Sequence, residues 1–532
     1  MSIKHQVSIH PADTACAIHL QQVVKPKIET PTAYADRIGQ IYVSKQDDHH
    51  RKSHGLYLTP QPVAAFMAGM IHPRNTLRLL DPAAGAGILL CATVERLATQ
   101  PAPPRQIEIT AYEIDPVLAD HLGQVLEHLT QWAGEKGIRL NATIYQQDFI
   151  LAEAAALNGN TSKLFDAVIA NPPYFKIGKL DPRAVAAEAV VYGQPNIYGL
   201  FMATAAALLE EGGDLVFITP RSFASGPYFK RFRERFFSMV RPTRTHVFES
   251  RRAAFGRDAV LQENVILQAK RHDAWPTNSS AYPFRISSSA GMTDLDLCAE
   301  WTTTLANVID RNNLEAAFRL PTSPKEEDIL HRVNRWTGSL HAHGFDISTG
   351  PVVPFRATEY LAKQANGITV PLLWLNHVRA MDISWPNTGR KPQYIDCKVG
   401  SHRLLVPNST YVILRRFSPK EDSRRMTAAP LLVGQLPAKM IGLENHLNYI
   451  HRPGGTISED EAFGLAALYN SALLDSYFRC INGNTQVSAT ELRAMPLPSL
   501  DTIKKLGQQI KNNGNDLAHI DYLVERLADA IP

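Results

Sequence analysis

"LLDPAAGAGILLCATVERL", residues 79–97, joins an apolar strand to a helix through a short glycine turn. The strand ends at Asp81, Gly85 and Gly87 lie in the turn, and the helix begins at Ile88. Such a unit at the carboxyl edge of a parallel sheet is typical of sites for nucleotide-like ligands. The turn lacks the third glycine of G-x-G-x-x-G, the motif whose backbone amides reach a pyrophosphate. An acid leading into this shorter turn favours a cationic ligand without phosphate, such as S-adenosylmethionine; the alternative is a plain strand-to-helix turn.

Short apolar strands alternate with longer helical stretches between about residue 54 and residue 270. This alternation is typical of a parallel sheet with helices on both faces. Seven strands are expected, at residues 77–80, 107–112, 142–145, 166–170, 214–219, 245–249 and 263–269. Because no helical stretch separates the last two, they are expected to pair antiparallel. We therefore predict a doubly wound α/β sheet of seven strands whose last strand runs against the others.

The chain is expected to divide into four parts. Residues 1–50 form an N-terminal extension, and residues 51–272 form the α/β domain. Residues 272–300 are rich in Ser, Pro and Asn, and a linker is expected at residues 273–324. Residues 325–532 form a second domain whose fold the sequence does not predict.

The composition is that of an ordinary globular protein, with 45% hydrophobic and 20% charged residues and a net charge of +4. The five cysteines have neither disulfide nor metal-ligand spacing, so a reduced protein with no metal is expected. The N-terminus has no apolar signal core and the chain has no membrane-length apolar run, which predicts a cytoplasmic protein without membrane contact.

Acidic residues follow the next two strands at the same predicted edge. Glu113 suits the ribose hydroxyls, and Ile114 beside it can pack on the adenine of the cofactor. Asp148 can accept from the adenine amino group, and Phe149 can cover the ring. Upstream, Tyr57 and Thr59 precede a helix that is expected to fold over the methionine end. The predicted cofactor contacts are thus Tyr57, Thr59, Asp81, Ala83, Gly85, Gly87, Glu113, Ile114, Asp148, Phe149 and Asn171.

The fourth strand runs into Asn171-Pro172-Pro173-Tyr174. The prolines form a stiff corner, because each fixes its φ angle and lacks an N–H. The Asn171 side-chain oxygen and the Pro172 carbonyl can accept both hydrogens of one NH2 group, which favours the pyramidal amine that attacks a sulfonium methyl. Tyr174 offers a stacking face for a base that has left its duplex. The motif predicts methylation of a planar amine.

The sequence resembles the N6-adenine DNA methyltransferases of type II restriction-modification systems, with the gamma order of motifs and a catalytic domain like that of the TaqI enzyme. HGLYLTP (54–60), DPAAGAG (81–87), YEID (112–115), QQDF (146–149) and NPPY (171–174) carry the resemblance. Four looser segments, which we call the recognition motifs, resemble target-recognition regions. They are STGPVVPFR (348–356), YVILRRFSPKEDSRR (411–425), GLENHLNYIH (442–451) and NGNTQVSATELRAMPLP (482–498).

The resemblance implies the class I S-adenosylmethionine-dependent methyltransferase fold and a target-recognition domain at residues 325–532. It implies a site-specific, adenine-specific DNA methyltransferase that uses S-adenosylmethionine and acts on double-stranded DNA. Members of the family hold the flipped adenine between the NPPY tyrosine, here Tyr174, and a phenylalanine, here Phe255. The alternative for Phe255 is an apolar anchor. A cognate restriction endonuclease is expected on a separate chain.

Two basic clusters suit contacts with DNA phosphates. Residues 221–257 hold ten Lys or Arg against two acids, and Arg415, Arg416, Lys420, Arg424 and Arg425 form the second cluster. A solvated helix face is the alternative for the first. At the level of function, two alternatives stay open. One is an RNA or protein-glutamine N-methyltransferase with the same NPPY chemistry, and the other is a non-catalytic DNA-specificity subunit.

Overall fold

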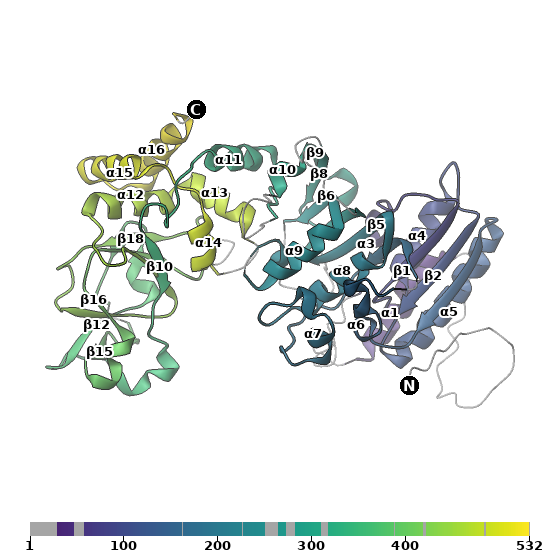
Figure 1. Cartoon of the computed structure of the whole chain (residues 1–532), viewed down its shortest axis with the longest axis horizontal. Helices are drawn as coiled ribbons and strands as arrows, with labels where there is room; N and C mark the ends of the chain where they lie inside the picture. The colour runs from purple at the N-terminus through teal and green to yellow at the C-terminus, as the bar shows by residue number, and fades with distance from the viewer. Residues whose placement is uncertain are drawn as a thin grey trace. The chain divides into compact units, whose positions relative to one another are not determined.

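The computed structural model describes residues 29–46, 58–161, 163–225, 227–249, 264–272, 282–309, 318–387, 389–418, 422–482 and 486–530. The chain divides into two compact units, residues 1–322 (unit 1) and 323–532 (unit 2) (Figure 1).

Unit 1 is built on a nine-stranded sheet with the order β3-β2-β1-β4-β5-β7-β6-β8-β9. The first five strands in the chain pair in parallel, whereas β7 pairs antiparallel with β5 and β6. The predicted α/β fold with an antiparallel β7 is therefore confirmed, but the predicted number of seven strands is wrong, because β8 and β9 extend the sheet beyond β6. The strands are β1 (Thr76–Asp81), β2 (Gln106–Tyr112), β3 (Arg139–Tyr145), β4 (Phe165–Ala170), β5 (Leu209–Pro220), β6 (Val240–Phe248), β7 (Asn264–Arg271), β8 (Pro283–Ser289) and β9 (Ala299–Thr304).

The expected linker at residues 273–324 is wrong. β8 and β9 lie inside it, with β8 parallel to β6 and antiparallel to β9. Phe284 and Ile286 alternate along β8 and are fully buried. The neighbouring sequence is rich in Ser and Pro, so this short alternation of apolar and polar residues is difficult to recognise as a strand. Burial of two apolar side chains is nevertheless enough to fix β8 in the sheet. The first unit consequently ends at Thr322 rather than at residue 272.

Helices cover both faces of the sheet (Figure 1). One hydrophobic core contains residues of α1, α3, α4 and α5, and a second contains residues of α6, α8, α9 and α10. Helix α8 is buried on all sides because its sequence is apolar throughout. The helices are α1 (Pro31–Ser44), α3 (Gln61–Ala68), α4 (Ile88–Ala98), α5 (Pro116–Glu135), α6 (Phe149–Glu153), α7 (Pro182–Ala186), α8 (Ile197–Ala207), α9 (Lys230–Met239) and α10 (Leu305–Val308).

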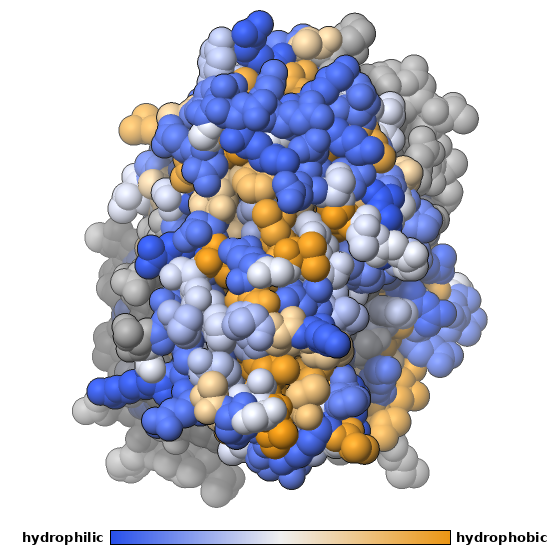
Figure 2. Space-filling view, turned by 90° about the vertical axis from the view of Figure 1, so that its left-hand side faces the viewer, coloured by the Kyte–Doolittle hydropathy of each residue, from blue (hydrophilic) through white to orange (hydrophobic). Residues whose placement is uncertain are grey.

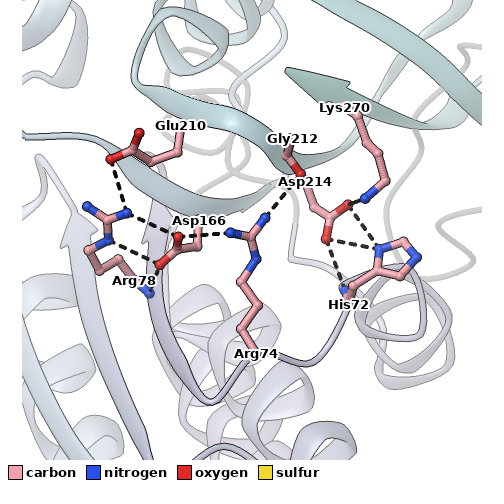
Figure 3. A network of polar contacts seen from close by, with 8 residues as sticks. All are labelled: His72, Arg74, Arg78, Asp166, Glu210, Gly212, Asp214 and Lys270. Carbon is pink, nitrogen blue, oxygen red and sulfur yellow. Dashed lines mark hydrogen bonds and ion pairs between the residues drawn. The ribbon is translucent and has the colours of Figure 1, made fainter. Parts of the chain in front are cut away.

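Two buried aspartates tie the segment before β1 to β4 and β5, toward the amino ends of these strands (Figure 3). Asp166 accepts hydrogen bonds from Arg74 Nη1 at 3.1 Å and from the Arg78 backbone N at 2.8 Å. Asp214 accepts from the His72 backbone N at 3.1 Å and pairs with Lys270 Nζ at 3.1 Å. Burial opposes ionisation of Asp214, but the contacts with His72 and Lys270 outweigh it and lower the pKa of Asp214. This network stabilises the edge of the sheet opposite to the one predicted to hold the site.

Unit 2 combines a four-stranded sheet, β10-β20-β17-β18, with a five-stranded sheet, β11-β15-β12-β19-β16, and a two-stranded ribbon, β13-β14. The strands are β10 (Asp346–Thr349), β11 (Leu361–Ala362), β12 (Thr369–Leu373), β13 (Val378–Arg379), β14 (Asp382–Ile383), β15 (Tyr394–Asp396), β16 (Leu405–Pro407), β17 (Tyr411–Arg415), β18 (Ala428–Leu431), β19 (Met440–Leu443) and β20 (Leu447–His451). The helices are α11 (Pro324–Asn334), α12 (Glu459–Asn470), α13 (Ala472–Ile481), α14 (Ala489–Ala494), α15 (Leu500–Asn513) and α16 (Leu517–Asp529).

Helices α12 and α15 pack with their backbones in contact. A Cβ placed on Gly507 would lie 1.9 Å from the Asp460 carbonyl oxygen, and one on Gly464 would lie 2.0 Å from that of Ile503. Only glycine allows two helices to approach this closely, so these two positions set the spacing of the pair.

Figure 2 shows one face of the molecule, where hydrophobic residues lie between hydrophilic ones in the middle and lower parts and the upper part is mostly hydrophilic. Exposed large apolar residues of unit 2 include Phe355, Ile368, Val399 and Val433. Single apolar side chains of this kind are normal on a protein surface, so they do not by themselves indicate a docking site. Among the helices that the structure describes, none is both long enough and apolar enough to cross a bilayer.

Candidate active site

Four predicted residues lie at neighbouring strand ends along the carboxyl edge of the sheet. In sheet order they are Asp148 after β3, Glu113 after β2, Asp81 at the end of β1 and Asn171 after β4. The chain reverses its strand order between β1 and β4, which is where ligands bind in doubly wound sheets. A cavity of about 420 Å³ lies here. It is lined by Leu58, Pro82, Ala83, Gly85, Tyr112, Glu113, Ile114, Asp115, Leu118, Gln147, Asp148, Phe149, Asn171, Pro173, Phe175, Arg183, Ile197 and Phe201.

The glycine turn has the geometry that its sequence requires. Gly85 and Gly87 have φ angles of 54° and 82°, in the left-handed region. A Cβ on Gly87 would lie 2.7 Å from Leu122 Cδ1, so Gly87 also lets α5 pack against the turn. A Cβ on Gly85 would have no atom of the described chain within 4 Å, because this residue borders the cavity. Gly87 thus serves packing, and Gly85 leaves room for a ligand.

Asp81 is a buried acid, and only one of its two carboxyl oxygens accepts a hydrogen bond from the described residues. Its Oδ1 accepts from the Ala83 backbone N at 3.1 Å, whereas Oδ2 has no hydrogen-bond partner among the described residues. Burial raises the pKa of Asp81 to about 8. Buried polar atoms normally have a partner, so an unused carboxylate oxygen beside this turn fits a ligand that brings a donor or a positive charge. The donor set therefore fits S-adenosylmethionine.

Glu113 holds the turn through both carboxylate oxygens. Oε2 accepts from the Gly85 backbone N at 3.0 Å, and Oε1 accepts from the Asp115 backbone N at 2.9 Å. Burial raises the pKa of Glu113 to about 7. Beside it, the apolar side chain of Ile114 is 59% exposed and lines the cavity. An exposed isoleucine at a cavity wall suits contact with a flat apolar ring.

Asp148 and Phe149 lie at the start of α6. Asp148 accepts from the Leu151 backbone N at 3.0 Å and lies 3.9 Å from Arg183 Nη1. Phe149 is almost fully buried and stacks on Phe201, with ring centroids 5.4 Å apart. Its ring therefore forms part of the cavity wall and of the core at once.

Two further cavity residues, Phe175 and Arg183, are not predicted from the sequence. The Arg183 guanidinium lies over the Phe175 ring, 5.7 Å from its centroid. Phe175 directly follows NPPY, and its position beside an aromatic platform is the signal that could have found it. Arg183 lies in the short helix α7, and nothing in its local sequence indicates that it reaches Asp148.

Asn171 links the NPPY corner to the segment before α3. Its Nδ2 donates to Thr59 Oγ1 at 3.1 Å, and its Oδ1 accepts from the Tyr174 hydroxyl. Pro172 is buried, and Pro173 lines the cavity. Thr59 lines a small adjoining cavity together with Asn171, Ala83 and Gly85. The structure thus brings residues of all five motifs at residues 54–174 to one place.

Tyr174 is only 7% exposed, and its hydroxyl oxygen also lies 2.9 Å from the Ile218 carbonyl oxygen, so the Ile218 carbonyl and Asn171 Oδ1 compete for its single proton. In this conformation the ring is a buried wall rather than the open stacking face that the sequence predicts. Tyr57 and Phe255 lie outside the described residues.

Several arginines of the basic clusters have structural roles. Arg233 is buried and donates to the Phe223 carbonyl at 3.2 Å, and Arg221 is buried and donates to the Leu320 carbonyl at 2.9 Å. In the second cluster Arg425 is buried and Arg424 pairs with Asp521. For the three buried arginines the prediction of phosphate contacts is wrong, because their side chains do not reach the surface.

The doubly wound sheet with an antiparallel β7, together with acids at three successive strand ends, defines a class I S-adenosylmethionine-dependent methyltransferase fold. The family model of the Eco57I restriction-modification methylase matches residues 115–255. The type II methyltransferase M.PstI of Providencia stuartii is 31% identical over 494 residues, which cover 92% of this chain and 96% of M.PstI. The type II methyltransferase M.BsuBI of Bacillus subtilis is 32% identical over 475 residues, or 88% of this chain and 92% of M.BsuBI.

The chain therefore belongs to the type II methyltransferases of restriction-modification systems, as the sequence motifs predict. Among solved structures, the type IIG restriction endonuclease BpuSI is similar with 14% identity and a TM-score of 0.45, covering 94% of this chain and 68% of that one. Similarity at this level carries no information about function.

Proposed function

We propose that this protein transfers a methyl group from S-adenosylmethionine to N6 of an adenine flipped out of duplex DNA, and so protects host DNA from a restriction endonuclease on a separate chain. The observation that carries the proposal is the position of Asn171-Pro172-Pro173-Tyr174 at the end of β4, beside the cavity that Glu113 and Asp148 line, with Asp81 buried directly behind the turn residue Ala83. An amine-binding corner and a set of acids for a nucleoside thus meet at one edge of the sheet.

In this proposal, different residues of the site contact different parts of the cofactor. Glu113 is placed to accept from the ribose hydroxyls, Ile114 to pack on the adenine ring and Asp148 to accept from its amino group. Asp81, whose pKa of about 8 keeps it largely protonated near neutral pH, is expected to ionise more readily when a cationic ligand binds at the glycine turn. When bound, S-adenosylmethionine supplies a methyl group on a positively charged sulfur. Its methionine end is expected near Thr59, which Asn171 contacts.

Methyl transfer requires that the target amine be held with its lone pair toward the methyl group. In the proposed mechanism, Asn171 Oδ1 and the Pro172 carbonyl accept the two amine hydrogens. Because the Tyr174 hydroxyl already donates to Asn171 Oδ1, it orients the amide oxygen and leaves that oxygen a second lone pair for the substrate. Tyr174 is also the proposed platform for the flipped base, with Phe255 on the other side of the base; because its ring is buried in this conformation, the role requires that the ring become exposed when DNA binds.

The proposal is tested by incubating the purified protein with methyl-labelled S-adenosylmethionine and duplex DNA, then digesting the DNA to nucleosides for mass spectrometry. N6-methyladenine is the expected product. Parallel reactions with RNA and with protein substrates test the alternative N-methyltransferases, and label in either of these alone would refute the proposal. Undetectable cofactor binding would leave only the non-catalytic DNA-specificity subunit.

Asn171→Ala should abolish methyl transfer, because it removes one of the two acceptors for the amine. Asn160→Ala is the matched control, since Asn160 is an exposed asparagine of the same unit, away from the cavity. Normal turnover by Asn171→Ala would contradict the assigned mechanism. Long-read sequencing of DNA from an expressing host reports the methylated sequence as well.

A further inference from the structure

Three of the four recognition motifs, far apart in the sequence, meet on one surface of unit 2. The Arg416 backbone N donates to the His446 carbonyl at 2.8 Å, and the Val487 backbone N donates to the Arg416 carbonyl at 2.8 Å. Phe417 and Gln486 form a β-bridge. The segment after β17 is therefore held between the β19–β20 turn and the segment before α14.

The side chains at this junction combine basic, aromatic and amide groups. We call it the junction surface and define it by Arg416, Phe417, Asn445, His446 and Gln486. His446 and Gln486 are exposed, and the other three are half-buried. The Arg416 guanidinium lies 5.7 Å from the Phe417 ring centroid, and its Nη1 donates to the Asn445 carbonyl at 3.1 Å. The Phe417 ring meets the His446 ring edge-on, with centroids 4.8 Å apart. These contacts fix the directions of both the guanidinium and the imidazole.

The buried carboxylate of Glu444 contacts the inner side of the His446 ring. Glu444 is fully buried, and its Oε1 lies 2.5 Å from His446 Nδ1, whereas the His446 side chain is 46% exposed. Neither carboxylate oxygen of Glu444 has a partner with hydrogen-bond geometry among the described residues, so the contact with His446 is a close ion pair rather than an aligned hydrogen bond. Burial raises the pKa of Glu444, while the charges of His446 and Lys391 oppose this shift. A buried carboxylate is unfavourable unless it is paired, so packing alone does not account for a glutamate at this position.

The contact with Glu444 determines which nitrogen of the His446 imidazole faces the solvent. Because Nδ1 faces the carboxylate, the proton on Nδ1 points toward Glu444, and in the imidazolium form the second proton, on Nε2, is left to donate to another partner. Nε2 has no hydrogen-bond partner within the described parts of the chain. A carboxylate that contacts one nitrogen of a histidine fixes the direction of the ring, as it does for metal-binding histidines, and so fixes where the other nitrogen points.

We propose that the junction surface contacts the sugar-phosphate backbone of duplex DNA, with Arg416 and His446 Nε2 as donors to phosphate oxygens and Glu444 as a positioning residue for His446. Charge complementarity identifies the occupant, because guanidinium and imidazolium are cationic donors that suit an anionic backbone. Phe417 supports both donors from the side. The inference rests on the proposed function, since it assumes that unit 2 binds DNA.

The test measures equilibrium DNA binding of the full chain by fluorescence anisotropy. Two duplexes are used: one carries a site that the parent protein methylates, identified by sequencing, and the other has the same composition in scrambled order. His446→Ala and Arg416→Gln should each weaken binding to both duplexes by about 5- to 10-fold and reduce the slope of log affinity against log salt by up to about 1. His446→Arg should recover part of the affinity. His341→Ala, at an exposed histidine of unit 2, is the matched control.

Glu444→Gln tests the positioning role. It leaves His446 in place but removes the carboxylate, so DNA affinity should fall toward that of His446→Ala while S-adenosylmethionine affinity is unchanged. Circular dichroism and urea unfolding of each variant separate this effect from misfolding. If Glu444→Gln fails to fold, His446→Ala and His446→Arg still decide the phosphate contact.

Two results would overturn the inference: unchanged binding by His446→Ala and Arg416→Gln, or a loss confined to the methylated site, which would indicate base contacts instead. Failure of the proposed function looks different. In that case the parent protein itself would not methylate DNA, whereas failure of this inference alone would leave the parent active and the variants indistinguishable from it.

Discussion

Replacing Glu113 by glutamine should make the protein more stable at high pH and weaken its cofactor binding. Burial raises the pKa of Glu113 from an ordinary value of 4.5 to about 7. A carboxyl whose pKa is raised on folding stabilises the folded state below its unfolded pKa, and this contribution is lost as the pH rises through the folded pKa. Glutamine cannot ionise, so the variant keeps its stability where the parent loses it.

The size of the effect follows from the shift. Between about pH 5.5 and pH 8, a carboxyl with these two pKa values lowers the free energy of unfolding by about 2 kcal/mol. The difference between the variant and the parent should therefore grow by about 2 kcal/mol over this range. Glutamine also replaces one acceptor oxygen, which now serves the Gly85 or Asp115 N–H, by a donor. That loss shifts the difference at every pH by the same amount, of order 1 kcal/mol, and leaves its pH dependence unchanged.

The assay is urea unfolding read by pulse proteolysis, with peptides from unit 1 quantified by mass spectrometry, because the two units need not unfold together. Glu188→Gln is the matched control, since Glu188 is an exposed glutamate of unit 1 that does not line the cavity. A difference between Glu113→Gln and the parent that stays constant from pH 5.5 to pH 8 would refute the reasoning.

Cofactor binding gives the second half of the prediction. If Glu113 accepts from the ribose hydroxyls, it must be ionised to do so fully, and S-adenosylmethionine affinity should rise with pH up to about 7 and then level off. The variant should bind about 10- to 100-fold more weakly at pH 8, the range expected when a hydrogen bond to a charged group is lost. Isothermal titration calorimetry measures both, and equal affinities would remove Glu113 from the cofactor site.

Three further substitutions test the fold around and away from the site. Gly507→Ala should destabilise unit 2 by about 1–3 kcal/mol, because its Cβ would lie 1.9 Å from the Asp460 carbonyl oxygen, while Gly367→Ala, with no described atom within 4 Å, should change little; urea unfolding compares them. Gly87→Ala combines a φ of 82° with a Cβ only 2.7 Å from Leu122 Cδ1, so the turn should lose about 1–2 kcal/mol and cofactor affinity should fall with it, as calorimetry would show. Asp214→Asn should destabilise unit 1 by about 2 kcal/mol above pH 4. Because folding lowers the pKa of Asp214, the difference in stability between variant and parent should shrink as the pH falls below 4 and through the folded pKa. Acid titrations followed by circular dichroism measure this difference.

The edge of the sheet and most of its site residues were predictable from local sequence. Apolar strands that end in Asp81, Glu113, Asp148 and Asn171 place these groups at one edge, since the carboxyl ends of parallel strands meet there. The glycine turn was predictable for a related reason, because left-handed φ angles at Gly85 and Gly87 are readily available only to glycine.

Long-range packing decided the rest, and local sequence does not encode it. Whether an arginine side chain is exposed to solvent or bound to a buried carbonyl depends on which distant segments pack over it. Arg221 and Arg233 are therefore buried, although the basic sequence around them predicts an exposed surface. Arg183 reaches Asp148, and β8 and β9 join the sheet, through contacts between distant segments. The junction of Phe417, His446 and Gln486 likewise exists only because three segments pair in space, and pairing of that kind is settled by the burial of a whole domain rather than by any one motif.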